Sequence, residues 1–235
     1  MLLKSFPFTG PLTRSSKAPN PLFGGSNSFI DDYFTGDIFS AFEEADDFEN
    51  AFFMFYAPWD ADCIRAVDTL ETVAKTFLDQ DIYFAAVNCW EPKGHCHTEF
   101  SGKSDKNAKN PRLVQHQYPI FIFYPKDRRG IQYNGPISVQ SMLEFLLLAK
   151  KPVQHISSKS DLINLRARHS GQALLGYFPN LIHGRKCRQV MKKFLDATYG
   201  FLESDPFQHK IGGIGIVTSP QVAFHLQLDS SRPLR

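Results

Sequence analysis

The chain has 235 residues, of which 43% are hydrophobic and 21% are charged, close to the average for a folded soluble protein. This length is large for one compact domain and comfortable for two. The formal net charge is +2 and no basic run is interleaved with aromatic residues, which argues against nucleic acid as a partner. Four cysteines are too few for a disulfide framework, and no stretch is long and apolar enough for a membrane span.

The first segment, residues 1–28, is expected to be a disordered lead-in. It is rich in Pro, Ser, Lys and Gly, a composition that does not form a packed core. Leu2 and Leu3 are not followed by the apolar stretch of a cleavable signal peptide. We therefore expect no signal peptide in this sequence.

The following part, residues 29–150, alternates between strand and helix patterns. Continuous apolar runs, typical of strands buried on both faces of a mainly parallel sheet, occupy 51–56, 82–88 and 119–124. Apolar residues at helical spacing predict helices over 38–45, 62–78 and 138–149. A turn at 126–130 and a short strand at 131–133 predict a hairpin. The polar stretch 91–110 has no period and is predicted to be a surface loop, with a short helix near 112–116.

After a linker at 150–152 the same alternation begins again. Strands are predicted over 153–156, 173–178 and 214–217, and helices over 160–168 and 186–203. A last helix is predicted after Ser219 and Pro220, because a hydroxyl can cap the helix and Pro suits its first position. The alternation in both halves predicts an α/β protein with parallel strand pairing.

One motif in the first half indicates a family. The sequence from Phe55 to Trp59 reads Phe-Tyr-Ala-Pro-Trp, and Cys63 follows at the start of a predicted helix. This closely resembles the Phe-Tyr-Ala-Pro-Trp-Cys-x-x-Cys motif of protein disulfide isomerases. Tyr118 and Pro119 precede the third apolar run, where that fold places a cis-proline beside the active site, and an X-Pro bond has the low cis penalty required. The resemblance implies a thioredoxin fold, with a mixed central sheet flanked by helices.

Compared with that family, the redox motif is degenerate. Dithiol exchange needs an exposed thiolate at a helix N-terminus and a second cysteine three residues later. The motif here consists of Trp59, Asp60, Ala61, Asp62 and Cys63. Asp60 therefore takes the place of the attacking cysteine, and we expect it to cap the helix. Cys63 matches the second cysteine, which is covered and has a high pKa in related folds, so we expect no catalytic residue in this motif.

Two further positions depart from the family pattern. Disulfide isomerases keep a buried Glu just before the Phe-Tyr-Ala-Pro-Trp run, and a Lys on the next strand pairs with it. The corresponding residues of this chain are Met54 and Ala86. The resemblance thus implies that the groups that move protons for the covered cysteine are also missing.

The remaining cysteines have a different interpretation. Cys89 ends a predicted strand and Cys96 lies in the loop after it, so a local structural disulfide is favoured over free thiols in an oxidising compartment. With His95 and His97 these cysteines resemble a zinc set, but the usual Cys-x-x-Cys or His-x-x-x-His half is missing. We therefore predict no metal and no cofactor. Cys187 lies in a predicted helix with no obvious partner.

Further residues narrow the resemblance and suggest a domain organisation. They are Asn88-Cys89-Trp90, Cys96, Gly135-Pro136, Lys151-Pro152, Ile156-Ser157-Ser158 and Leu175-Gly176-Tyr177-Phe178. This set is similar to that of a membrane-anchored member of the superfamily in the endoplasmic reticulum. The second half resembles redox-silent thioredoxin-like domains without their final hairpin and helix. We expect a thioredoxin domain with a degenerate active site over 29–150 and a C-terminally truncated one over 151–235.

The function implied by the resemblance is protein binding, as a scaffold or chaperone-type adaptor in the endoplasmic reticulum. The groove beside Trp59 and Pro119 is the first candidate contact surface. The resemblance implies client or membrane-protein partners, including dual oxidases and EF-hand proteins. One alternative is a monothiol oxidoreductase in which Cys63 forms mixed disulfides, and another is a non-functional fragment or splice product.

Overall fold

The structure of the chain is a computed structural model that describes residues 19–25, 28–100, 118–126, 128–168, 172–178, 185–209 and 212–228. Most of the predicted lead-in, at 1–18 and 26–27, lies outside the described residues, as does the predicted helix near 112–116.

The first half of the chain is built on a five-stranded sheet with the order β1-β3-β2-β4-β5. Its strands are β1 (Asp31–Tyr33), β2 (Asn50–Tyr56), β3 (Ile82–Asn88), β4 (Ile120–Pro125) and β5 (Ile131–Tyr133). Strands β1 and β2 run parallel to β3, whereas β4 is antiparallel to β2 and β5 is antiparallel to β4. The predicted mixed sheet of a thioredoxin fold is confirmed.

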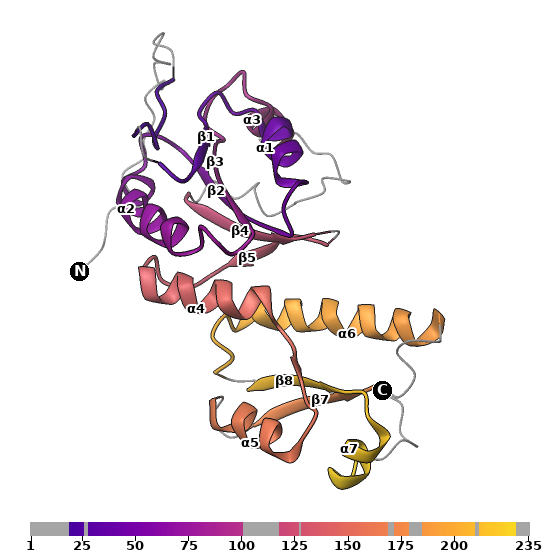
Figure 1. Cartoon of the computed structure of the whole chain (residues 1–235). Helices are drawn as coiled ribbons and strands as arrows, with labels where there is room; N and C mark the ends of the chain where they lie inside the picture. The colour runs from indigo at the N-terminus through magenta and orange to yellow at the C-terminus, as the bar shows by residue number, and fades with distance from the viewer. Residues whose placement is uncertain are drawn as a thin grey trace, which may run out of the picture.

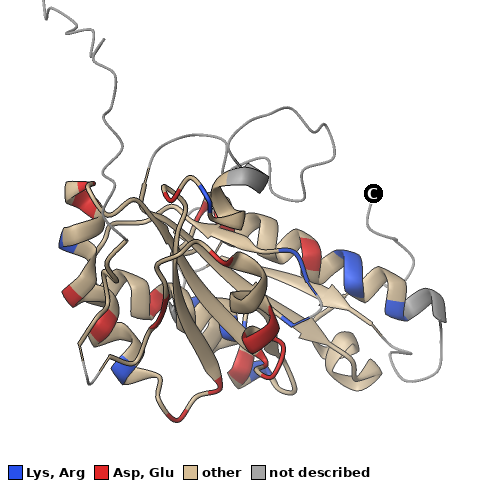
Figure 2. Cartoon of the chain, turned by 90° about the horizontal axis from the view of Figure 1, so that it is seen from above, with Lys and Arg blue, Asp and Glu red and all other residues tan. Residues whose placement is uncertain are grey.

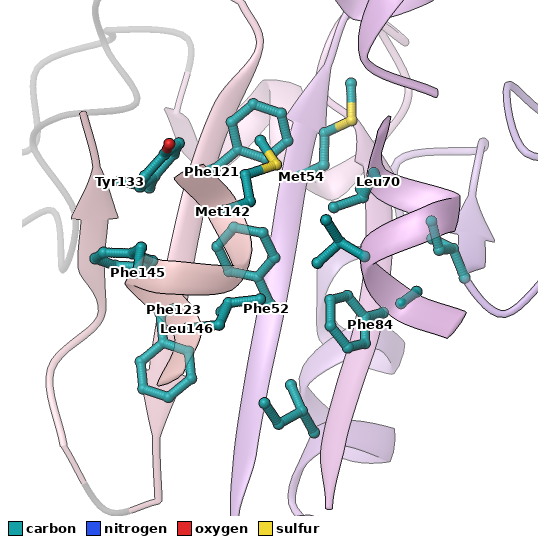
Figure 3. Close-up of a cluster of buried hydrophobic side chains, with 14 of the residues drawn as sticks. Phe52, Met54, Leu70, Phe84, Phe121, Phe123, Tyr133, Met142, Phe145 and Leu146 are labelled. Atoms are coloured by element: carbon teal, nitrogen blue, oxygen red, sulfur yellow. The ribbon is translucent and has the colours of Figure 1, made fainter. Parts of the chain in front are cut away.

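Helices cover both faces of this sheet. They are α1 (Ile38–Ala45), α2 (Ala61–Thr76), α3 (His95–Phe100) and α4 (Val139–Lys150). In Figure 1, α2 and α4 lie on one side of the sheet, and α1 and α3 on the other. The buried residues form a matching pair of clusters. The larger one, drawn in Figure 3, packs aromatic and Met side chains such as Phe52, Met54 and Phe145 between the sheet and helices α2 and α4.

The second half forms a smaller parallel sheet with the order β6-β8-β7. Its elements are β6 (Gln154–His155), α5 (Lys159–Arg168), β7 (Ala173–Tyr177), α6 (Arg185–Ser204), β8 (Gly213–Val217) and α7 (Pro220–His225). Ser219 caps α7 through the backbone N–H of Val222, and Pro220 is the first residue of the helix, as predicted. Figure 1 shows α6 on one side of this sheet, facing the first half, with α5 and α7 on the other side.

Helix α6 connects the two sheets. Leu202 of α6 is 1% exposed and belongs to the larger core cluster of the first half. Arg128, in the turn between β4 and β5, donates to Asp196 at 2.9 Å, and Arg129 donates to Glu203 at 3.1 Å. The backbone N–H of Gln132 also donates to Glu203 at 3.0 Å. Apolar packing and ion pairs therefore both hold α6 against the first half.

Two local features differ from the sequence expectation. Residues 19–25, expected as part of the disordered lead-in, pack onto the first half, where Phe23 is 5% exposed and belongs to the core. The predicted loop over 91–110 contains helix α3. Just before this helix, the backbone of Gly94 packs closely against the backbone of Gly36. A side chain at position 94 would not fit, since its Cβ would lie only 2.8 Å from the Gly36 Cα. The backbone N–H of Cys96 donates to the Gly36 carbonyl at 2.9 Å, which fixes the start of α3.

Charged residues of both signs are interspersed over the described surface, as Figure 2 shows from above. No helix of the described residues is long and apolar enough to span a bilayer.

Candidate functional site

The degenerate motif lies where β2 ends and α2 begins. Asp60 is the N-cap of α2, with an extended backbone conformation. One of its carboxylate oxygens accepts the backbone N–H groups of Asp62 and Cys63 at 2.9 and 3.0 Å. These N–H groups have no partner within the helix, and the helix dipole also favours a negative charge there. Asp60 thus satisfies the helix start, where disulfide isomerases place their attacking thiolate.

Cys63 lies one turn into α2 and is 0% exposed. Burial raises the pKa of its thiol to about 12, partly offset by a hydrogen bond with the Ala57 backbone and reinforced by the charge of Asp60. A neutral, covered thiol is a poor nucleophile, since the thiolate is the reactive form. Asp62, next to it in sequence, is exposed and pairs with Arg65.

Trp59 projects from the same turn and is 58% exposed. Its ring meets the ring of Trp90 edge to face, with centroids 5.0 Å apart and an interplanar angle of 76°. Trp90 follows β3, and its backbone N–H donates to the side-chain oxygen of Asn88 at 3.0 Å. Asn88 is buried and donates in turn to the Phe34 carbonyl at 3.0 Å. Buried Asn88 thus fixes the turn that presents Trp90 to Trp59.

The turn that carries Trp90 is also held by a disulfide. Cys89 and Cys96 are bonded to each other, with Cα atoms 4.9 Å apart, so the start of α3 is joined to the end of β3. The backbone N–H of Cys89 donates to the Tyr56 carbonyl at 3.0 Å, and the Cys89 carbonyl lies 3.2 Å from Nδ1 of His97. Because the two sulfurs bind each other, they are not free thiolates for a metal. Among the described residues, no group of three or more His, Cys, Asp or Glu residues is arranged to hold one.

The third part of the site is the segment before β4. The peptide bond between Tyr118 and Pro119 is cis. Tyr118 is partly buried and packs against both core clusters of the first half. Burial raises its pKa, and Cys63 adds to the shift. Ile120, which follows Pro119, pairs with Phe55 near the end of β2, so the cis-proline segment lies at the same end of the sheet as the start of α2. The motif, the Trp90 turn and the cis-proline therefore belong to one end of the sheet.

Comparisons with known proteins agree with this geometry. Thioredoxin domain-containing protein 11 of Bos taurus is 30% identical over 162 residues, which are 68% of this chain and 15% of the bovine protein. The Homo sapiens protein of that name is 29% identical over 162 residues, again 68% of this chain and 15% of the relative. The chain is a thioredoxin-domain protein of the disulfide isomerase-like type. Both relatives carry the name of the superfamily member that the motifs around Trp59, Cys89 and Lys151 indicated in the sequence analysis.

Two other comparisons complete this result. The crystal structure of human ERp44 in form II superposes with a TM-score of 0.50 at 16% identity, covering 86% of this chain and 48% of that one, a likeness that shows the fold. No known protein-family profile matches the chain. The chain spans about 15% of the length of the curated relatives it matches.

The thioredoxin domain also contains site residues that the sequence analysis missed. Trp90 was named only as part of a motif, and its contact with Trp59 depends on the turn set by Asn88. Asp32 on β1 was not singled out. Its carboxylate accepts the Tyr56 hydroxyl at 2.7 Å and the backbone N–H groups of Leu22 and Phe23 at 2.5 and 2.9 Å. Asp32 therefore fastens residues 22 and 23 to the domain.

Proposed function

We propose that this thioredoxin domain is a redox-degenerate protein-binding module, and that the chain acts as a scaffold or chaperone-type adaptor in the endoplasmic reticulum. The observation that carries the proposal is exposed Trp59 in contact with half-buried Trp90, at the end of the sheet that also holds the cis-proline. A capping carboxylate stands at the helix start there in place of the thiolate. The surface formed by Trp59, Trp90, Tyr118 and Pro119, which we call the tryptophan surface, is the proposed contact site.

The chemistry of the tryptophan surface suits extended, apolar segments of unfolded or partly folded proteins. Exposed tryptophan contributes a large apolar area, and tryptophans are enriched among the residues that dominate binding energy at protein interfaces. The Trp59 ring is braced by Trp90, so less side-chain freedom is lost when a client binds. Neither contribution requires a thiol.

The alternative, a monothiol oxidoreductase, has less support. It requires Cys63 to be accessible with a lowered pKa, whereas the side chain is 0% exposed and burial raises the thiol pKa to about 12. A mixed disulfide with a client therefore requires α2 to open first.

The division into a thioredoxin domain over 29–150 and a truncated thioredoxin-like domain over 151–235 forms part of the same proposal. The two separate sheets support it, and the contacts of α6 would hold both domains in one orientation. Dual oxidases and EF-hand proteins, implied by the family resemblance, are the first specific partners to test.

A thiol-free client tests the proposal. The probe is a reduced and carboxymethylated secretory protein, whose binding to the whole chain is measured by titration calorimetry. Trp59→Ala and Trp90→Ala are each expected to weaken binding by about tenfold or more. Phe224→Ala is the matched control, because Phe224 is an 80% exposed aromatic residue on α7. Cys63→Ala is expected to bind like the parent chain.

Three outcomes would overturn the proposal: no binding by the parent chain, equal losses in Phe224→Ala and Trp59→Ala, or loss of binding in Cys63→Ala. Far-UV circular dichroism of each variant separates loss of contact from loss of fold. A client with free thiols tests the alternative. If its binding depends on Cys63 and is reversed by reductant, the monothiol oxidoreductase replaces the thiol-independent binding module as the proposed function.

A further inference from the structure

A pocket of about 440 Å³ lies where the first half of the chain meets the smaller sheet. Its lining residues come from the end of α4, the segment that joins α4 to β6, the strands β6 and β8, helix α5 and the turn after α6. None of the described lining residues belongs to β7, to α7 or to the tryptophan surface. Pockets of this size between domains are typical sites for small ligands. The pocket is therefore a separate candidate site.

The pocket contains a buried amide that has no hydrogen bond partner. Gln208 is 5% exposed, and among the described residues only its backbone groups form hydrogen bonds. In the same part of the chain, every side-chain nitrogen or oxygen that is fully shielded from solvent has a partner. The Gln208 amide is therefore not fully shielded, and the small area that it retains faces the pocket that Gln208 lines. A desolvated amide of this kind gains from a ligand that can donate and accept hydrogen bonds.

The turn after α6 holds Gln208 in place. Its φ of 53° lies in the left-handed region, which residues with a side chain rarely adopt. The N–H of Gln208 donates to the Asp205 carbonyl at 3.0 Å, and the Gln208 carbonyl accepts the N–H of Gly212 at 3.2 Å. Buried Asp205 also accepts the N–H of His209 through its carboxylate at 3.1 Å. Because the turn is fixed, a ligand of the amide has little backbone freedom to remove.

The rest of the pocket is mainly apolar. Leu165 of α5 and Ile214 of β8 are 3% and 2% exposed, and they line it together with half-buried Leu148 of α4. These side chains come from three elements, so an apolar group that enters the pocket is enclosed from several sides. Burial of such a group is favourable by about 25 cal/mol per Å² of apolar area.

The pocket has one cation and no acid among its described lining residues. Lys151, the C-cap of α4, is exposed and forms no ion pair with a described residue. His155 also lines the pocket, but its ring nitrogens lie 3.0 and 2.9 Å from the hydroxyls of Ser157 and Thr218. Lys151 is thus the group that is available for a ligand charge, and it selects a negative one.

We propose that this pocket binds the C-terminal end of an apolar peptide. The terminal carboxylate pairs with Lys151, and the last peptide group bonds to the Gln208 amide. A peptide group has one donor and one acceptor, which match the acceptor and the donors of a glutamine amide. The last apolar side chains of the peptide pack in the space lined by Leu148, Leu165 and Ile214. This site takes a chain end, and it does not depend on the tryptophan surface.

Calorimetric titration of the whole chain with acetyl-Leu-Leu, a probe with a free carboxylate, tests the proposal. The expected dissociation constant is on the order of 100 µM, and the amidated probe is expected to bind about tenfold more weakly. Lys151→Met is expected to weaken binding of the acid about tenfold and to leave the amidated probe unchanged. Lys159→Met is the matched control, because Lys159 is an exposed lysine of α5 that does not line the pocket.

A second pair of measurements tests the amide and the location. Gln208→Leu keeps a side chain of similar size without the amide, and is expected to weaken binding of both probes about tenfold. Trp59→Ala is expected to bind acetyl-Leu-Leu like the parent chain. Decanoate, an apolar acid without a peptide group, is expected to bind more weakly than acetyl-Leu-Leu.

Four results would overturn the proposal. They are no binding of acetyl-Leu-Leu at millimolar concentration, equal affinity for the acid and the amidated probe, loss of binding in Trp59→Ala, and decanoate binding as tight as that of acetyl-Leu-Leu. The last result would assign the pocket to a fatty acid, and the third would move the probe to the tryptophan surface. The comparisons between probes use the parent chain, so they decide the question even if Gln208→Leu does not fold.

Discussion

Met54 on β2 lies directly opposite Ala86 on β3, and neither side chain is exposed to solvent. By the family resemblance, the two positions are expected to match the buried Glu and Lys that move protons for the covered cysteine in disulfide isomerases. Met54, Ala86 and Cys63 belong to the same apolar cluster. Neither Met54 nor Ala86 can donate or accept a proton. Introducing a cysteine at position 60 alone is therefore not expected to restore the whole redox site.

The first prediction follows from this pair. Asp60→Cys is expected to form a disulfide with Cys63, yet to exchange it slowly, because no acid or base at positions 54 and 86 assists the buried thiol. Adding Met54→Glu and Ala86→Lys is expected to speed exchange on the order of 10²-fold, the usual contribution of a positioned acid or base. Insulin reduction measures the rate. If the triple variant is folded but no faster than Asp60→Cys, the apolar pair is not the cause.

The second prediction concerns the helix cap. Asp60→Ala is expected to lower the free energy of unfolding by about 1 kcal/mol, because the N–H groups of residues 62 and 63 lose their acceptor. Asp60→Asn keeps an acceptor and is expected to lose less. Asp62→Ala is the control, since its exposed ion pair with Arg65 contributes little. Urea denaturation gives the three values, and an equal loss in the Ala variants at 60 and 62 would refute the assigned cap.

The third prediction concerns the disulfide between Cys89 and Cys96. Its short loop predicts a stabilisation of about 2–3 kcal/mol, lost in the double Cys→Ala variant. Because the disulfide holds the turn that carries Trp90, its loss is also expected to weaken client binding at the tryptophan surface. Calorimetry with and without reductant measures both effects. If client binding does not change after the disulfide is reduced, the disulfide does not support the tryptophan surface and this prediction is wrong.

The fourth prediction concerns Asp32. Burial raises its pKa above 3.8, opposed by the hydrogen bonds from Phe23, Tyr56 and Leu22. The folded chain thus holds this proton more tightly than the unfolded chain, and the resulting stability is lost as the pH rises through the raised pKa. Asp32→Asn keeps one acceptor oxygen for the N–H groups of Leu22 and Phe23, and its NH2 group can donate to the Tyr56 oxygen. Because it also removes the buried charge, it is expected to be at least as stable as the parent at neutral pH. Asp32→Ala is expected to lose about 2 kcal/mol.

Unfolding of the parent and both variants by urea at pH 7 and pH 4 tests this account. The gain in stability on acidification that is due to Asp32 should be present in the parent and missing from Asp32→Asn. A parent and an Asn variant with the same pH dependence would show that Asp32 does not titrate as proposed.

The sequence was most informative where a local pattern determines structure. Apolar runs such as Ala51 to Tyr56 marked the buried strands, and the motif after β2 located the start of α2. Contacts between distant segments were not predictable in this way. The backbone N–H groups that donate to Asp32 belong to residues 22 and 23, which the composition assigned to a disordered lead-in. Helix α3 was missed because its polar residues lack a period, and it depends on the disulfide and on Gly94.

The central claim is that the thioredoxin domain binds proteins with a site whose remaining thiol is inactive. Alkylation of Cys63 in the folded chain, mapped by mass spectrometry at neutral pH with and without denaturant, tests it most directly. With a pKa raised to about 12 and no exposed area, Cys63 is expected to stay unmodified until the chain unfolds. Rapid alkylation of Cys63 in the native chain, or its trapping of glutathione, would contradict the claim and favour a monothiol enzyme.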